Sequence, residues 1–247
     1  WVVSALGGDT VMPPTAGIGT IIHEAMEKVP DGDLEQMRAI VAEHWPELDF
    51  ETEWIGRKER RRADLYVDRL HTYLGDVRRD GGRVVGSETR FDFAVSLPDD
   101  DGLPVVHDVG DERGARAIVS GYIDRVEAYP PGAGEHPPAR GRGWTAMTAA
   151  GEGERAVVVD LKTGRTDPEA DAGVREHAQL AAYQVAVQQG LIEGAPADAL
   201  AGARLVIVSK TLAKSDYRIA HQHTLDDTAR EAFLRRVADA ARGMSAS

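Results

Sequence analysis

The sequence contains no cysteine. Disulfides, thiolate zinc sites, cysteine nucleophiles and iron–sulfur clusters are therefore excluded within its 247 residues. Any metal ion that binds here must be held by oxygen and imidazole ligands, which favours Mg²⁺ or Mn²⁺ over a structural zinc. The absence of thiols is also compatible with a reducing cytoplasm.

Long apolar runs are missing as well. No stretch approaches the roughly 20 residues that cross a bilayer, and the first residues do not resemble a signal peptide, so we expect no membrane partner. The hydrophobic fraction of 42% still suffices for one well-buried core. Because the chain starts at Trp1 rather than at a methionine, we expect a fragment of a larger protein.

Basic residues are in the minority. The chain has 41 acidic against 29 basic residues, a net charge of −12. A dedicated nucleic-acid binder normally carries a basic footprint, so this balance alone argues against one. A site that holds a metal needs acidic ligands, however, and partner domains can supply phosphate-binding charge. We interpret the one basic cluster, Arg57–Arg62, as the solvated end of a helix, with a DNA-binding patch as the alternative.

The hydrophobic pattern divides the chain into a helical front and a sheet. Apolar residues at helical spacing predict three helices, the first entered through a glycine turn: Thr15–Val29, Leu34–Trp45 and Arg57–Arg79. After Gly81, alternating β-branched and aromatic residues predict strands, namely Val84–Leu97, Pro104–Val109, Ala115–Tyr129, Arg155–Leu161, Arg204–Ser209 and Asp216–His223. Two further helices are predicted over Gly173–Gln189 and Asp226–Ala241.

The expected fold class is α+β (α/β), with a central mixed β-sheet flanked by helices. We expect one domain over residues 1–247, made of a helical front (1–80), a sheet core (81–223) and a C-terminal helix (224–247). Residues 130–153 are rich in proline, glycine, alanine and arginine, and we interpret them as a long loop between two strands.

The most informative stretch is Val157–Gly164. Its valines indicate a strand buried in the sheet, and Asp160 and Lys162 stand two residues apart, so both side chains leave on one face while Leu161 points into the core. A buried carboxylate and ammonium are costly unless they have a function. The alternative is a salt bridge at the end of a strand, and this strand alone does not decide between them.

A second strand, Ser120–Glu127, carries Asp124 within an apolar alternation. If this strand pairs with the one at Val157, Asp124 and Asp160 converge on one hard cation, and Gly121 permits close backbone approach. Two aspartates and a lysine are a minimal set for phosphodiester hydrolysis. The carboxylates hold Mg²⁺, the metal polarises the phosphate and activates water, and the lysine orients the nucleophile or neutralises developing charge.

Four short motifs follow one another along the chain, and together they resemble a known family. They are Gly19-xxx-His23, Gly121-xx-Asp124-Arg125, Asp160-x-Lys162-Thr163 and Gln179-xxx-Tyr183. This set resembles the RecB-like nucleases of the PD-(D/E)XK superfamily, particularly the C-terminal nuclease modules of AdnA/AdnB-type bacterial helicase–nucleases. The resemblance implies a restriction-endonuclease-like core with a helical N-terminal part.

The resemblance also implies roles for individual residues. His23, Asp124 and Asp160 are expected as metal ligands, joined by the main-chain carbonyl of Leu161. Asp124, Asp160 and Lys162 are then the catalytic residues, with Lys162 as the catalytic lysine. The cofactor is expected to be Mg²⁺ or Mn²⁺, with no iron–sulfur cluster.

Gln179 and Tyr183 lie four residues apart on one helical face and are expected to contact DNA phosphate or steady the site. Plainer explanations stand beside these roles. A histidine on an apolar helix face, such as His23, is more often a satisfied core residue, and Tyr183 among Ala and Val fits a core position. Glu88 stands where relatives often carry an acid, but a strand glutamate on a solvated face explains it equally well.

The implied protein is a metal-dependent deoxyribonuclease of exonuclease type in the bacterial cytoplasm, acting in DNA end processing and double-strand break repair. Its partners would be DNA, in particular single-stranded ends, a helicase motor in the same chain and a partner subunit. Because of the net charge, we expect few and local DNA contacts, from Lys162, Gln179, Tyr183, Arg125 and Lys210.

Some relatives hold the C-terminal part of this fold with an iron–sulfur cluster on four cysteines, which this chain lacks. We therefore expect packing to hold its last helix through Ala229, Phe233, Leu234, Val237 and Ala241.

Two other functions remain as alternatives. One is a catalytically inactive nuclease fold that serves as a scaffold or DNA-end sensor, since fold alone does not fix function. The other is an unrelated magnesium hydrolase of free nucleotides, although the sequence has no GxxxxGK[ST] phosphate-binding loop.

Overall fold

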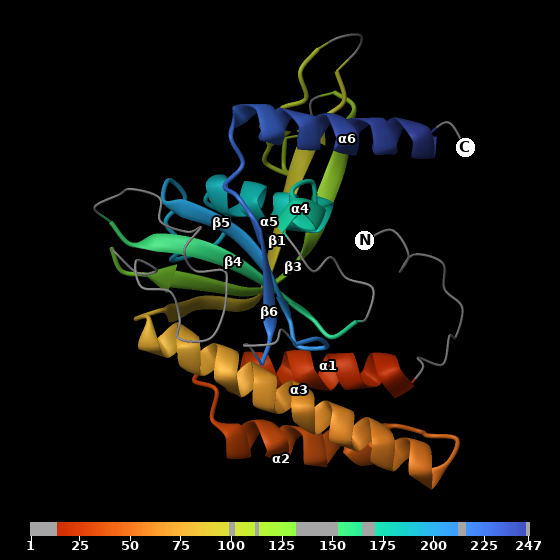
Figure 1. The fold of residues 1–247 in the computed structure, drawn as a ribbon. Helices are drawn as coiled ribbons and strands as arrows, with labels where there is room; N and C mark the ends of the chain where they lie inside the picture. The colour runs from red at the N-terminus through yellow and green to blue at the C-terminus, as the bar shows by residue number, and fades with distance from the viewer. Residues whose placement is uncertain are drawn as a thin grey trace.

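A mixed β-sheet forms the centre of the protein (Figure 1). Its six strands follow the order β2-β1-β3-β4-β5-β6. The structure is a computed structural model that describes residues 14–98, 102–111, 114–131, 153–164, 171–211 and 216–245. The strands are β1 (Arg83–Ser96), β2 (Val106–His107), β3 (Arg116–Tyr129), β4 (Arg155–Lys162), β5 (Leu200–Ile207) and β6 (Arg218–Gln222). The expected α+β class with a mixed sheet is confirmed.

Helices cover both faces of this sheet. The chain forms α1 (Pro14–Lys28), α2 (Leu34–His44), the 3₁₀ turn η2 (Trp45–Glu47), α3 (Glu53–Arg79), α4 (Asp171–Val174), α5 (Ala178–Gln188) and α6 (Asp227–Ser245). Helices α1, α2 and α3 lie on one side of the sheet, and α4, α5 and α6 lie on the other (Figure 1). No helix in the described part of the chain is long and apolar enough to span a membrane.

Strand β4 separates two hydrophobic cores. Val157, Val159 and Leu161 pack into the core with α1, α2 and α3, whereas Ala156 and Val158 pack into the core with α5 and α6. This is the period of two expected for a strand buried on both faces. The inward direction predicted for Leu161 is confirmed, and Asp160 and Lys162 are thereby placed on the α5 side.

Strand pairing brings the two predicted carboxylate strands together. β3 and β4 are antiparallel, with Arg125 opposite Val159, as the convergence of Asp124 and Asp160 requires. β4 and β5 are parallel, and α5 lies in the connection between them, as parallel strands require a crossover. Helix α5 therefore passes beside the end of β4 that carries Lys162.

A buried network of charges lies on the α3 side of the sheet. Arg125 Nε donates to Glu127 Oε1 at 2.8 Å, Arg204 also pairs with Glu127, and the Tyr73 and Tyr129 hydroxyls donate to the same carboxylate. Such a network needs every partner, because a lone buried charge is costly. Arg125 is only 1% exposed, so the expected DNA contact of Arg125 is wrong.

Some element boundaries differ from the prediction. Helix α1 begins at Pro14 and contains Gly17 and Gly19, so the two glycines expected in a turn are part of the helix instead. α3 begins at Glu53, and β2 has two residues. The helix predicted over Gly173–Gln189 is broken into α4 and α5, because the His177 ring accepts a hydrogen bond from Leu180 N and starts a new helix there.

The C-terminal helix α6 is held by packing. Phe233 and Leu234 are buried and Val237 is partly buried against the α5 core, as predicted. Ala229 is exposed and is not part of this core, whereas Ala238, which was not predicted, is fully buried. The long loop predicted over residues 130–153 lies largely outside the described residues.

Candidate active site

Asp124 and Asp160 come from neighbouring antiparallel strands. The backbone N–H of Leu161 donates to Asp124 Oδ2 at 2.8 Å, which fixes the Asp124 carboxylate across β3 and β4. Both aspartates are buried, at 9% and 1% exposure. Buried carboxylates occur where they bind a cation or another partner.

His23 reaches this pair from helix α1. Its Nδ1 lies 3.3 Å from Asp124 Oδ2. One turn earlier on α1, a Cβ atom added to Gly19 would lie 2.9 Å from Thr163 Oγ1. Glycine at this position thus lets α1 approach the end of β4, and the spacing of the Gly19-xxx-His23 motif has a packing explanation.

Glu88 completes a cluster that the sequence only partly indicated. It lies in β1, and the nearest ligand atoms of His23, Glu88 and Asp124 all lie within 4.8 Å of one another. Glu88 has a φ of +46°, and no other non-glycine residue in the described part of the chain has a positive φ. A left-handed backbone at such a residue costs about 1–2 kcal/mol and concentrates at functional sites. This irregular backbone at Glu88 cannot be seen in the sequence, which left its place in the cluster undecided.

Burial dominates the electrostatics of the cluster. It raises the pKa of Asp160 to about 7, with the neighbouring Asp124 charge adding to the effect. Burial also raises the pKa of Asp124 to about 6 and raises the pKa of Glu88 above its usual value. The pKa of His23 is lowered, again mainly by burial. Neutral imidazole and crowded carboxylates form a donor set that fits a hard divalent cation.

Lys162 connects the carboxylates to helix α5. Its Nζ lies 2.8 Å from Asp160 Oδ2 and donates to Gln179 Oε1 at 3.1 Å. The Gln179 amide in turn donates to the Tyr183 hydroxyl at 2.6 Å. The chain Asp160–Lys162–Gln179–Tyr183 holds the ammonium at the edge of the site.

The structure thus brings together all the residues predicted for the site. His23 and Asp124 lie in direct contact, and the Leu161 main chain lies within hydrogen-bonding reach of His23. Asp160 lies beside Lys162 rather than among the closest three ligands. Tyr183 is a core residue, only 5% exposed, and also a hydrogen-bond partner within the site.

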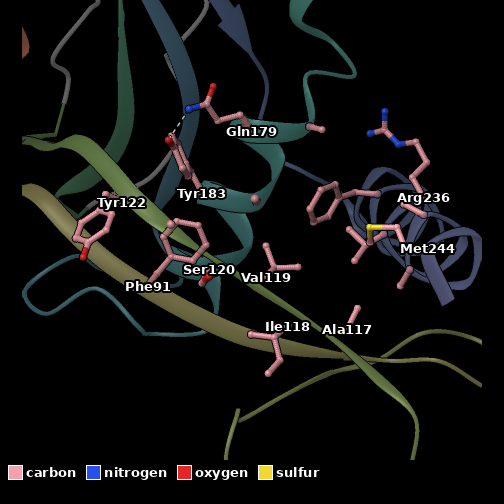
Figure 2. Close-up of a pocket in the computed structure, with 17 residues that line it drawn as sticks. Phe91, Ala117, Ile118, Val119, Ser120, Tyr122, Gln179, Tyr183, Arg236 and Met244 are labelled. Atoms are coloured by element: carbon pink, nitrogen blue, oxygen red, sulfur yellow. Dashed lines mark hydrogen bonds between the residues drawn. The ribbon is translucent and has the colours of Figure 1, made fainter. Parts of the chain in front are cut away.

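A groove begins at this hydrogen-bonded chain. Gln179 and Tyr183 line a cavity of about 520 Å³ between α5, α6 and the first half of β3 (Figure 2). The ring of Phe91 forms part of the same wall and packs edge to face on Tyr183 at 5.7 Å between centroids. It also covers Gly121, since a Cβ there would lie 3.2 Å from the Phe91 ring. Gly121 was expected to permit close approach of another backbone segment, but the group that approaches it is the Phe91 side chain.

The basic cluster Arg57–Arg62 has mixed surroundings. Arg57 pairs with Glu53 at the solvated start of α3, as the preferred interpretation requires. Lys58 and Arg62, however, line a second cavity together with Gly19, Thr163 and Gly164. This cavity adjoins the turn that follows Lys162.

Comparison with known protein families matches residues 5–136 and 148–247 to the PD-(D/E)XK nuclease superfamily. The chain belongs to this superfamily. The mixed sheet flanked by helices is consistent with its restriction-endonuclease-like core. Members are in general hydrolytic nucleases that use divalent metal ions and act on DNA. Among curated proteins, the chain has no significant match.

Proposed function

We propose that this chain is a Mg²⁺- or Mn²⁺-dependent deoxyribonuclease that hydrolyses DNA phosphodiester bonds. The observation that carries the proposal is the approach of His23, Glu88 and Asp124 within 4.8 Å, beside the Asp160–Lys162 pair. An inactive scaffold has no need to retain these costly buried groups.

The ligands of the metal would be His23, Glu88, Asp124, Asp160 and the main-chain carbonyl of Leu161. A cation bound there would polarise the phosphate and lower the pKa of a water molecule. Oxygen and imidazole donors without thiolates suit Mg²⁺ or Mn²⁺.

Besides the metal ion, the site would contain a positive charge from the chain itself, the ammonium of Lys162. Asp160 and Gln179 hold its ammonium from two sides, so it is oriented before the substrate arrives. Preorganised charge of this kind stabilises the negative charge that develops on phosphate oxygens. Tyr183 fixes the orientation of the Gln179 amide, so that the amide oxygen faces Lys162.

We further propose that the chain is the nuclease module of a helicase–nuclease that processes DNA ends in double-strand break repair, with exonuclease activity. The support is the order of the four motifs, which resembles the AdnA/AdnB-type modules, and the net charge of −12. A nuclease with so little overall attraction for DNA benefits from a tethered motor that raises the local strand concentration.

Cleavage of linear single-stranded DNA in Mg²⁺ tests the catalytic proposal. Asp160→Asn should abolish cleavage, whereas Asp92→Asn should not, because Asp92 lies on β1 with a half-exposed side chain paired to Arg90. Full activity of a folded Asp160→Asn protein would overturn the assignment, and the scaffold alternative gains if the wild-type protein binds DNA ends without cutting them.

A further inference from the structure

The groove beside Lys162 has walls from three separate elements. Helix α5 contributes Gln179 and Tyr183, helix α6 contributes Arg236 and Met244, and β3 contributes residues 117–122 (Figure 2). Its volume of about 520 Å³ lies within the roughly 300–1,000 Å³ usual for ligand pockets. Because Gln179 lines the groove and accepts a hydrogen bond from Lys162, one end of the groove lies next to the proposed site of cleavage.

The lining of this groove is apolar and partly aromatic. Alanines from α5 and α6 leave space, and the crossed rings of Phe91 and Tyr183 form a wall next to the active site. At the rim, Tyr122 and Met244 are 56% and 53% exposed. Exposed apolar surface inside a groove marks a binding site. The part of a DNA strand that matches such a lining is the flat face of a nucleobase.

The charge of the groove favours an anionic ligand. The chain has 12 more acidic than basic residues, yet among the described residues that line the groove none is acidic and Arg236 is basic. One N–H of Arg236 donates to the carbonyl of Glu176 at 2.9 Å, which holds the guanidinium at the rim. A guanidinium in this position suits a backbone phosphate.

We infer that this groove receives an unstacked nucleotide of a single DNA strand next to the scissile phosphate, with the base between α5, α6 and β3 and its phosphate at Arg236. In a duplex the bases are stacked and paired and do not present their faces. The groove therefore selects single-stranded substrate. This inference rests on the proposed nuclease function.

Abasic substitution tests the inference. Single-stranded oligonucleotides that carry one abasic residue, moved stepwise past the cleavage position, are digested in Mn²⁺ and the rates compared. Loss of the base that occupies the groove should slow wild-type cleavage at least about 10-fold at one or two neighbouring positions, as removal of a stacking contact does. Duplex DNA of the same sequence should be cut more slowly than the single strand.

A bulky side chain that fills the groove should remove the sensitivity of cleavage to an abasic residue. Ala240 lines the groove and is exposed on α6, so Ala240→Trp can fill it without entering the core. This variant should cut the unmodified strand about as slowly as the wild type cuts the abasic one, with no further effect of the abasic residue. Ala229→Trp is the matched control, since Ala229 is exposed on the same helix but does not line the groove.

Charge is tested separately. Arg236→Gln should raise KM for the single strand, whereas Arg235→Gln should not, because Arg235 pairs with Glu231 away from the groove. Equal cleavage of all abasic substrates by the wild type, or wild-type behaviour of Ala240→Trp, would overturn the inference. Cleavage of the unmodified single strand by the wild type separates the two proposals: its absence in both Mg²⁺ and Mn²⁺ defeats the nuclease function itself, and its presence leaves only the groove in question.

Discussion

Removing the charge of Asp160 should make the metal-free protein more stable at alkaline pH. In the folded protein burial and the Asp124 charge raise the pKa of Asp160 from 3.8 to about 7. The folded state therefore holds this proton more tightly than the unfolded state does. The free energy of unfolding falls as pH rises from about 4 through about 7 and then levels off.

The size of the effect follows from the same shift. One pKa unit corresponds to about 1.4 kcal/mol, so the full cost of ionising Asp160 is about 4 kcal/mol at pH 8. Part of this is offset in Asp160→Asn, because Lys162 loses its carboxylate partner at 2.8 Å and keeps Gln179. We expect a net gain of at least about 1 kcal/mol, which is about 2–4 °C in Tm for a chain of this size.

Thermal unfolding in EDTA at a series of pH values measures this. The Tm difference between Asp160→Asn and the wild type should be small at pH 5 and grow to pH 8. Mg²⁺ at pH 8 should stabilise the wild type, by about 2.7 kcal/mol at a hundred times its Kd, and should stabilise the variant much less. Asp239→Asn, on the exposed face of α6, is the control. A difference that does not change with pH would refute the reasoning.

Three further predictions concern the chemistry and the DNA contacts. Lys162→Ala should lower turnover roughly 10²-fold, as loss of a single electrostatic stabiliser does, while the affinity for Mn²⁺ stays unchanged or rises slightly. Single-turnover cleavage at saturating Mn²⁺ measures this, and normal turnover would make Lys162 only a structural partner of Asp160. Glu88→Gln should weaken Mn²⁺ binding by about 10-fold in titration calorimetry because one charged oxygen is lost, and unchanged affinity would remove Glu88 from the ligand set. Lys58→Gln should reduce the salt slope of single-stranded DNA binding by about 0.7, the value for one phosphate contact, whereas Arg57→Gln, which lies at the solvated start of α3, should not.

The part of the site that follows strand periodicity was predictable from the sequence. Asp160 and Lys162 stand two residues apart in a valine-rich strand, so their shared face and the inward direction of Leu161 follow from the pleat alone. The pairing that brings Asp124 to them was a hypothesis from the sequence, and the β3–β4 register confirms it. The roles of His23 and Gln179 were predicted only through the resemblance of their motifs to those of the RecB-like nucleases.

The parts that depend on contacts between distant segments were not predictable. Glu88 joins the cluster through a left-handed backbone at φ +46°, which no local pattern encodes. Gly17 and Gly19 suggested a turn, but their missing side chains make room for Leu48 and Thr163. The break between α4 and α5 follows from capping by His177, which is not among the usual N-cap residues.

The net charge of the whole chain is a poor guide to the charge in the neighbourhood of the site. At −12 it argues against a nucleic-acid partner, but two acids of the site, Asp124 and Asp160, are buried, and Asp160 is only 1% exposed. Burial, together with the charge of a neighbouring acid, raises the pKa values of Asp160 and Asp124, and a cation bound there would offset their charge at the place where phosphate must approach. The groove on one side of the site is lined by Arg236 and, among the residues described, by no acid. The cavity on the other side is lined by Lys58, Arg62 and one acid, Glu59, whose charge is paired with Arg62. We therefore expect attraction for DNA to be short-ranged and to act beside Lys162, where the total charge of the sequence has little influence.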